Sequence, residues 1–172
     1  MSEIFKILEK EGVIKDKYAD FDFLLDKPVV LERIATLIIE IKLKGKEKDF
    51  DAIVAADKIK GPYGALPLAI LVAVKMKKQL LIWKEQLIGA HELFGNTEPF
   101  MEEQGRRYRK RALILHDVNW RGSTVTKIAK DIEEKGFELF KILSILEREE
   151  VEKFQVFKDI EKRGIVDYID KL

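Results

Sequence analysis

The most informative segment of the chain is Leu113-Ile114-Leu115-His116-Asp117-Val118-Asn119-Trp120-Arg121-Gly122-Ser123-Thr124. The apolar run 112–115 predicts a buried strand that brings Asp117 to its tip, and a tight loop follows over 117–122. Apolar residues then recur at helical spacing from Val125 to Ile132, so a helix is predicted that Ser123 or Thr124 can cap. The backbone N–H groups and the dipole at such a helix start attract phosphate. The segment therefore predicts a strand–loop–helix unit with a candidate phosphate-binding loop.

Strands and helices are predicted to alternate along the rest of the chain. Short apolar runs predict further strands at 51–56, 80–83, 137–146 and 165–168, and helical periodicity predicts helices at 2–10, 28–45, 65–76 and 149–163. The segment 84–105 is polar and without sustained periodicity, which predicts a long loop. This alternation predicts one α/β domain over residues 1–172: an open, mainly parallel sheet with helices on both faces, and a small hood formed by residues 1–27.

The site is expected beyond the carboxyl ends of the strands, where ligands bind in open parallel sheets. That rule points to the loops 57–64, 84–105 and 117–122. Asp117 is placed to accept hydrogen bonds from a sugar diol, and Gly122 would let a phosphate approach the backbone closely. Ser123 and Thr124 could add hydroxyl donors. The structural alternative is that Asp117 and Ser123 only cap a turn and a helix.

Composition narrows the function classes. The 172 residues are 47% hydrophobic, and 32 basic residues nearly cancel 31 acidic ones, so the net charge of +1 gives no reason to expect a nucleic-acid or membrane partner. The chain has no cysteine, which excludes disulfides, cysteine-ligated metals and thiol nucleophiles. Charged residues reach 37%, and Asn and Gln are scarce, which is typical of thermophilic proteins. No signal peptide or membrane span is apparent, so a cytoplasmic location is expected.

Several segments resemble the type I phosphoribosyltransferases, and among these most closely the orotate phosphoribosyltransferases. The run Leu113–Val118 followed by Gly122-Ser123-Thr124 is similar to the family's signature of a strand, two acids and a hydroxyl-rich loop. The other segments that resemble the family are Phe23–Pro28, Asp51–Val54 with Gly64–Ala69, Trp83-Lys84-Glu85 and Leu146–Glu149. The resemblance extends over most of the chain.

The resemblance implies transfer of phosphoribosyl from phosphoribosyl pyrophosphate to a nucleobase, with release of pyrophosphate and with Mg²⁺ as cofactor. It implies catalytic roles for Asp117, Lys84 and His91. It implies that phosphoribosyl pyrophosphate contacts His116, Asp117, Asn119, Arg121, Gly122, Ser123, Thr124, Lys60, Gly61 and Gly64. Arg148 and Trp120 would contact the base, and a homodimer is expected. The residues that would hold the metal are left open.

The chain also differs from the family pattern: the loop that corresponds to the pyrophosphate loop is several residues longer, and Trp120-Arg121 fills a place normally held by small residues. His116 stands where the family has its first acid, and Trp83 stands where it has an arginine. In the segment 85–91 the lysine expected on a mobile catalytic loop is missing and only His91 remains. Two hypotheses therefore stay open: a transferase acting on orotate, another pyrimidine or a purine, and a catalytically weakened sensor of phosphoribosyl pyrophosphate or of a nucleotide.

Two charged segments have both a structural and a functional interpretation. Arg148 lies in Glu147-Arg148-Glu149-Glu150, which by composition alone is a surface ion-pair segment. The run 106–111 contains five cations and is either a solvated strand entry, a nucleic-acid contact or an anion clamp that reaches a neighbouring subunit.

Overall fold

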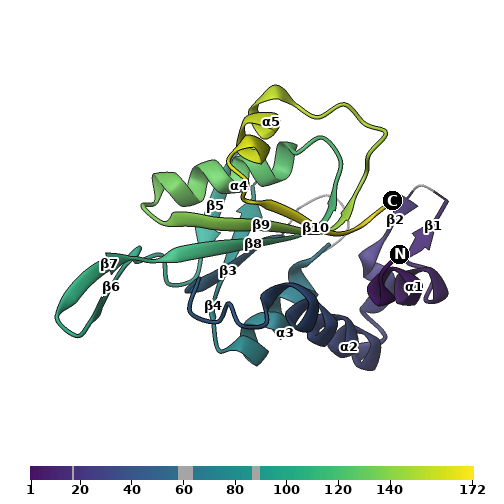
Figure 1. Ribbon diagram of the computed structural model, residues 1–172, viewed down its shortest axis with the longest axis horizontal. Coiled ribbons are helices and arrows are strands. Elements are labelled where there is room, and N and C mark those ends of the chain that lie inside the picture. The colour runs from purple at the N-terminus through teal and green to yellow at the C-terminus, as the bar shows by residue number, and fades with distance from the viewer. Residues whose placement is uncertain (17, 58–63, 87–89) are drawn as a thin grey trace.

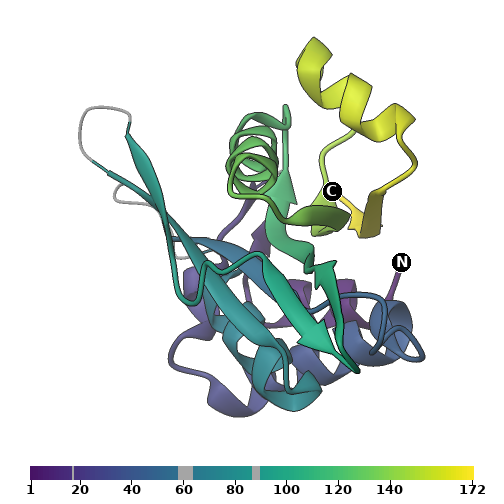
Figure 2. The same ribbon diagram turned by 90° about the vertical axis from the view of Figure 1, so that its left-hand side faces the viewer.

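A computed structural model shows a six-stranded sheet between two layers of helices, and it describes residues 1–16, 18–57, 64–86 and 90–172. Helices α4 and α5 cover one face of the sheet, and α2 and α3 cover the other (Figures 1 and 2). The predicted α/β class with helices on both faces is confirmed.

The predicted helices and strands occur in the order expected from the sequence, and the structure adds β1, β2, η1 and β5 to β7, whose bounds are given below. The helical elements are α1 (Glu3–Lys10), η1 (Phe21–Leu24), α2 (Pro28–Ile38), η2 (Ile39–Leu43), α3 (Leu66–Met76), α4 (Ser123–Glu134) and α5 (Gln155–Lys162). The strands are β1 (Ile14–Lys15), β2 (Tyr18–Ala19), β3 (Ala52–Asp57), β4 (Gln79–Glu85), β5 (His91–Phe94), β6 (Phe100–Glu103), β7 (Arg106–Arg109), β8 (Arg111–Asn119), β9 (Glu138–Glu147) and β10 (Val166–Lys171).

The main sheet has the strand order β10-β9-β8-β3-β4-β5. All of its pairs are parallel except β4 with β5, which is antiparallel. The carboxyl ends of β3, β4, β8 and β9 therefore lie at one edge of the sheet. The segments that follow these strands meet at this edge, as the sequence predicts.

Both faces of the sheet are buried, and this explains why its central strands are continuously apolar. Successive side chains of a strand point to opposite faces. In β3, Ile53 and Ala55 pack with α2 and α3, whereas Ala52, Val54 and Ala56 belong to the core beneath α4 and α5. The apolar cores on the two faces of the sheet thus fix the strands whose carboxyl ends form the candidate site.

The segment 84–105 is not the long loop that the sequence predicts. It contains β5, which pairs with β4, and the β6–β7 hairpin, which projects from the body (Figure 1). Gln104 and Gly105 form the two-residue turn of this hairpin, both with positive φ, as the twist of a tight hairpin requires. Strands of four residues with mostly exposed side chains give no measurable alternation, which is why the prediction failed.

Three predicted boundaries also change. Strand β8 continues to Asn119, so Asp117 lies within the strand and not at its tip. Helix α5 starts at Gln155 and not near 149, because the preceding residues are tied to other elements: the Phe154 N–H donates to the Arg121 carbonyl at 3.0 Å. The predicted helix 28–45 consists of α2 followed by the π-helical turn η2.

Residues 1–27, predicted as a hood, contain α1, the β1–β2 pair and η1. They lie at the end of the sheet where β8 and β9 terminate (Figure 1). The two termini are adjacent, since the backbone N–H of Ser2 donates to the Asp170 carboxylate on β10. In the described parts of the chain, no helix combines the length and the apolar character needed to cross a membrane.

Candidate functional site at the end of β8

A pocket of about 310 Å³ lies where β8 ends and α4 begins. Its lining consists of Ala19 from the hood and residues 116–124. Seven residues predicted as ligand contacts thus line one cavity: His116, Asp117, Asn119, Arg121, Gly122, Ser123 and Thr124. Trp120, predicted to contact the base, lines it as well.

Asp117 lies against Gly64, which precedes α3. A Cβ atom on Gly64 would lie 2.7 Å from Asp117 Oδ2, and Gly64 has a φ of +58°, so a larger residue here would be strained and would displace the carboxylate. Asp117 is nearly buried, and its Oδ1 lies 3.3 Å from His116 Nδ1. Gly64, from the predicted ligand loop 57–64, is thus next to Asp117, from the predicted ligand loop 117–122. Lys60 and Gly61, also predicted as ligand contacts, lie outside the described residues.

The amino end of α4 points its free N–H groups at the pocket. The first intrahelical bond runs from the Thr126 N–H to the Gly122 carbonyl at 3.0 Å, and the N–H groups of residues 123–125 precede it. Gly122 is the N-cap, and no side chain caps the helix, so the predicted capping by Ser123 or Thr124 is wrong. The amide donors stay available to an anionic ligand instead.

Gly122 has a structural role besides its place in the loop. Its φ is +83°, and a Cβ there would lie 2.1 Å from Cγ of Phe157 on α5. Phe157 is fully buried, so it cannot move aside. Gly122 therefore allows the loop to pack on α5, a contact between distant segments that the sequence does not reveal.

A network of polar side chains fastens β8, β9, β10 and α5 together beside the pocket. Lys153 Nζ donates to Glu147, to Glu161 at 2.6 Å and to the Tyr168 hydroxyl at 3.3 Å. Asn119 Nδ2 donates to the same hydroxyl at 3.1 Å, so this side chain supports the strand end. Tyr168 in turn donates to Glu161 at 2.9 Å.

The protonation equilibria in this network are strongly shifted. Burial by itself would lower the pKa of Lys153, but its hydrogen bonds to Glu147, Glu161 and Tyr168 outweigh burial and raise the pKa well above its ordinary value. Burial and the bond to Glu161 raise the pKa of Tyr168. Lys153 is therefore a permanent cation at neutral pH. Neither residue can be recognised from the sequence, because each is brought to the site only by the packing of α5 and β10.

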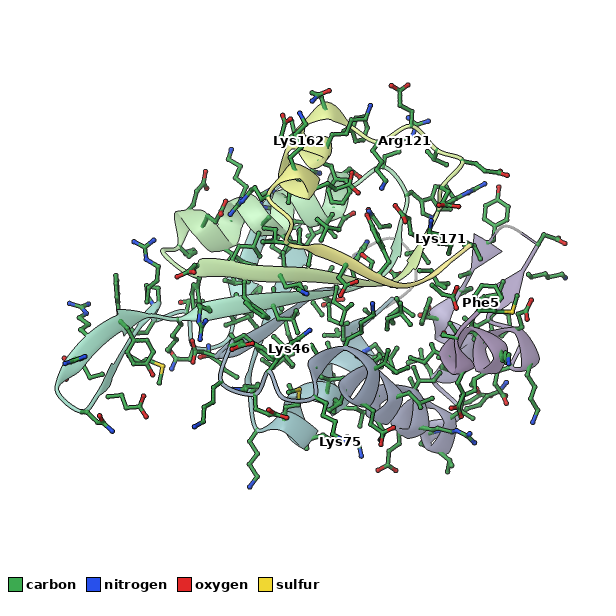
Figure 3. All side chains as sticks on the ribbon, in the orientation of Figure 1. Phe5, Lys46, Lys75, Arg121, Lys162 and Lys171 are labelled. Carbon is green, nitrogen blue, oxygen red and sulfur yellow. The ribbon has the colours of Figure 1, made fainter. Side chains whose placement is uncertain are left out.

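Arg148 and Trp120 lie together at the rim of the pocket. Arg148 Cζ is 4.4 Å from the centroid of the Trp120 ring and 5.3 Å from that of Tyr18 in the hood. The Tyr18 and Trp120 rings are themselves 5.9 Å apart. The structure thus brings the two predicted base-contact residues together and adds Tyr18, which no local pattern in the sequence marks. Arg121 follows Trp120 in sequence and lies near the start of α5 (Figure 3).

The predicted catalytic residues Lys84 and His91 have different surroundings. Lys84 is the penultimate residue of β4, with Nζ 3.7 Å from Asp57 Oδ2, at the same sheet edge as the pocket. His91 is part of β5 and not of a loop, and its Nδ1 lies 2.5 Å from Asp131 Oδ2 on α4. Trp83 Nε1 donates to the same oxygen at 2.6 Å. Within this chain, His91 therefore does not line the pocket that contains Asp117.

No cluster of three or more metal-binding side chains occurs among the described residues. The pocket offers the Asp117 carboxylate and a cradle of amide groups. This donor set fits Mg²⁺ in its common mode, in which one carboxylate and the phosphates of a substrate share an ion that keeps several waters. It does not fit a metal held by the protein alone.

Comparison with known proteins identifies the fold. No family model and no curated protein matches the sequence. Solved structures do match: orotate phosphoribosyltransferase from Aeropyrum pernix aligns with a TM-score of 0.70 and 17% identity over 97% of this chain and 92% of that one. Adenine phosphoribosyltransferase from Trypanosoma brucei, in complex with AMP, pyrophosphate and ribose-5-phosphate, gives 0.67 and 16% over 99% and 80%. Mycobacterium tuberculosis orotate phosphoribosyltransferase, in complex with 5-phospho-α-D-ribosyl 1-diphosphate, gives 0.58 and 14% over 98% and 89%. The chain therefore has the fold of the type I phosphoribosyltransferases.

Proposed function

We propose that this protein is a phosphoribosyltransferase that moves the phosphoribosyl group of phosphoribosyl pyrophosphate to a nucleobase and releases pyrophosphate. The main support is the contact between Gly64 and the Asp117 carboxylate beside the amino end of α4. An acid that can bind a diol and a helix end that can bind a phosphate lie side by side there. A ribose 5-phosphate carries both a diol and a phosphate, so it can use the two groups together.

Different residues of the site would contact different parts of phosphoribosyl pyrophosphate. The N–H groups of residues 123–125 would hold the 5′-phosphate, and Asp117 with His116 would hold the ribose hydroxyls. Lys84 would contact pyrophosphate from the end of β4. The ring carbon gains positive charge as pyrophosphate leaves, so the fixed charge of Asp117 favours the transition state without a protein nucleophile. Mg²⁺ would neutralise part of the pyrophosphate charge when it is bound with the substrate.

The assembly and the acceptor also belong to this proposal. The structural neighbours include enzymes named for orotate and for adenine. Arg148 at the pocket rim favours an acceptor that carries negative charge, such as orotate, because its guanidinium is a permanent cation. As part of this proposal, the protein is a homodimer and is located in the cytoplasm.

A second candidate, a sensor of phosphoribosyl pyrophosphate or of a nucleotide, is favoured by two contacts. His116 replaces a carboxylate next to Asp117, so the fixed negative charge beside the ribose is smaller. His91 is held by Asp131, away from the pocket. Both features would slow the transfer step more than they would weaken binding.

Calorimetric titration with phosphoribosyl pyrophosphate and Mg²⁺, followed by pyrophosphate-release assays with orotate, uracil, adenine and guanine, tests these candidates. Binding with release supports the enzyme, and binding without release supports the sensor. Asp117→Asn should weaken binding about 10- to 100-fold, because it removes hydrogen bonds to a charged acceptor. Asp167→Asn is the matched control, since Asp167 pairs with Lys42 and Lys141 away from the pocket. Wild-type protein that binds no phosphoribosyl pyrophosphate would refute the enzyme, and if AMP and UMP titrated in the same way do not bind either, the sensor is refuted as well.

A further inference from the structure

The hairpin of β6 and β7 carries cations that the candidate site does not use. Residues 100–111 contain five cations and two acids, a net charge of +3 in a chain whose net charge is +1. Three exposed arginines belong to β7: Arg106, Arg107 and Arg109. Glu102 and Glu103 lie opposite two of them in the register, but no arginine of β7 forms an ion pair with a carboxylate of the described residues. The near-zero net charge of the chain thus conceals a locally cationic element.

The hairpin stands clear of the body of the protein. The Lys110 N–H donates to the Pro99 carbonyl at 2.7 Å and closes the base of the hairpin. Beyond this bond the two strands project from the sheet, and side chains extend on both sides of them (Figures 1 and 3). Because successive side chains of a strand alternate between its faces, Arg107 and Arg109 share one face and Arg106 lies on the other. Arginines therefore project from both faces of a two-stranded ribbon.

The cationic surface continues from the hairpin along the amino ends of the strands, opposite the candidate site. The starts of β3, β4 and β8 are joined there: the Asp51 N–H donates to the Arg111 carbonyl at 2.8 Å, and the Gln79 N–H donates to the Asp51 carbonyl at 3.2 Å. The segments 44–51 and 77–79 carry five lysines and three acids. The lysines are Lys44, Lys46, Lys48, Lys77 and Lys78.

The cations of this edge bind neutral acceptors. Arg111 Nη2 donates to the Lys48 carbonyl at 2.6 Å. Lys110 is nearly buried, and its Nζ donates to the amide oxygen of Gln79 at 3.4 Å. The nearby Asp51 carboxylate accepts from the backbone N–H of Arg111 at 2.8 Å. Within the described ranges, no ion pair with a carboxylate neutralises a cation of this edge, so the edge attracts an anionic partner.

The shape of the hairpin favours duplex DNA as this partner. The major groove of B-DNA, about 12 Å wide, admits a two-stranded β-ribbon, whereas that of A-form RNA is deep and narrow. Single strands are bound through bases stacked on aromatic rings. The hairpin has two such rings, and Arg107 Cζ lies 4.3 Å from the centroid of one of them, Phe100. In a duplex groove, cations on both faces of the ribbon can reach the phosphates of both walls.

We infer that the β6–β7 hairpin and the cationic amino edge of the sheet bind duplex DNA through its phosphates. The inference does not rest on the proposed function, because the hairpin and the candidate site lie at opposite ends of β8. Such binding is electrostatic, so it is strong at low salt and weakens steeply as salt rises.

Fluorescence anisotropy of the full chain with a labelled DNA duplex of about 20 bp, at salt concentrations from about 50 to 200 mM, tests the inference. The triple variant combines Arg106→Gln, Arg107→Gln and Arg109→Gln. It should bind DNA about 10- to 100-fold more weakly at the lowest salt, and the slope of log K against log salt should fall by about 2 to 3, about one for each lost phosphate contact. The three side chains are exposed, so the urea unfolding midpoint should stay at the wild-type value.

The matched control removes the same charge from the helices. It combines Lys130→Gln, Lys158→Gln and Lys162→Gln, three cations that pair with neighbouring acids. The control should keep nearly the wild-type affinity for DNA. Equal losses in the two triple variants, or no binding of DNA by the wild type at the lowest salt, would overturn the inference.

Other probes separate duplex DNA from other anionic partners. A duplex RNA of the same sequence should bind more weakly than the DNA, because its major groove does not admit the ribbon. RNA that binds as tightly as DNA, or polyglutamate that does so, would overturn the assignment to DNA. Phosphoribosyl pyrophosphate should bind the arginine variant and the wild type alike. A loss of that binding in the arginine variant would assign the arginines to the site of a neighbouring subunit, and the inference would fail while the proposed function stands. If DNA binds through the hairpin and phosphoribosyl pyrophosphate does not bind the wild type, the proposed enzyme fails and the inference stands.

Discussion

Replacing Gly122 by alanine should destabilise the whole domain. The substituted residue would keep a φ of +83°, which costs about 1–2 kcal/mol for a residue with a Cβ. The new Cβ would also lie 2.1 to 2.6 Å from three atoms of Phe157, and relief of such overpacking costs about 1–3 kcal/mol. The sum of about 2–5 kcal/mol is a large part of a typical domain stability of about 5–15 kcal/mol.

Urea unfolding followed by circular dichroism measures this loss. Gly45→Ala is the matched control, because Gly45 has a φ of +78° but a Cβ at this residue would meet no atom within 4 Å. The free energy of unfolding of this control should fall by only the backbone strain of about 1–2 kcal/mol. Combining Gly122→Ala with Phe157→Leu should give a smaller loss than the sum of the two single changes. Equal losses for Gly122→Ala and Gly45→Ala, or strict additivity with Phe157→Leu, would refute the clash as the cause.

The remaining predictions concern buried polar groups. Lys153→Met should lower the free energy of unfolding by about 3 kcal/mol in urea titrations, because it leaves Glu147 without its cation. The folded state raises the pKa values of Lys153 and Tyr168 above 10.5 and 10.0, so their contribution is complete below about pH 10 and is lost as pH rises further. Stability measured from pH 8 to pH 11 should therefore fall steeply near the upper limit, and less so in Lys153→Met. Asp131→Ala should cost about 1–3 kcal/mol in thermal unfolding by leaving the Trp83 N–H unpaired, whereas Asp131→Asn, which keeps an acceptor, should cost less.

Most of the fold was predictable because its signals are local. The apolar runs of β3, β8 and β9 are bounded by turns, and α4 has a clear apolar face, so strand and helix types follow from periodicity. The errors fall at β5 to β7, where short strands at the sheet edge or outside it have mostly exposed side chains. Such strands are specified by their pairing partners and not by their own pattern.

The pocket was predictable where it is contiguous in sequence, from His116 to Thr124. Its remaining parts come from distant segments. Gly64 reaches Asp117 because β3 and β8 are parallel neighbours, and Tyr18 reaches Arg148 because the hood lies over the end of β9. His91 was assigned to a catalytic loop, but pairing with β4 directs it to Asp131.

The sequence by itself determined the α/β class, the alternation of elements and the helix end that can bind a phosphate. These depend on steric preferences and periodicities within a few residues. Only the tertiary structure decided that Gly122 packs on Phe157, that Lys153 fastens the strand ends and that Arg148 is held by two aromatic rings. Each of these contacts joins segments that strand order and register bring together, and a one-residue change of register would turn the side chains to the opposite face.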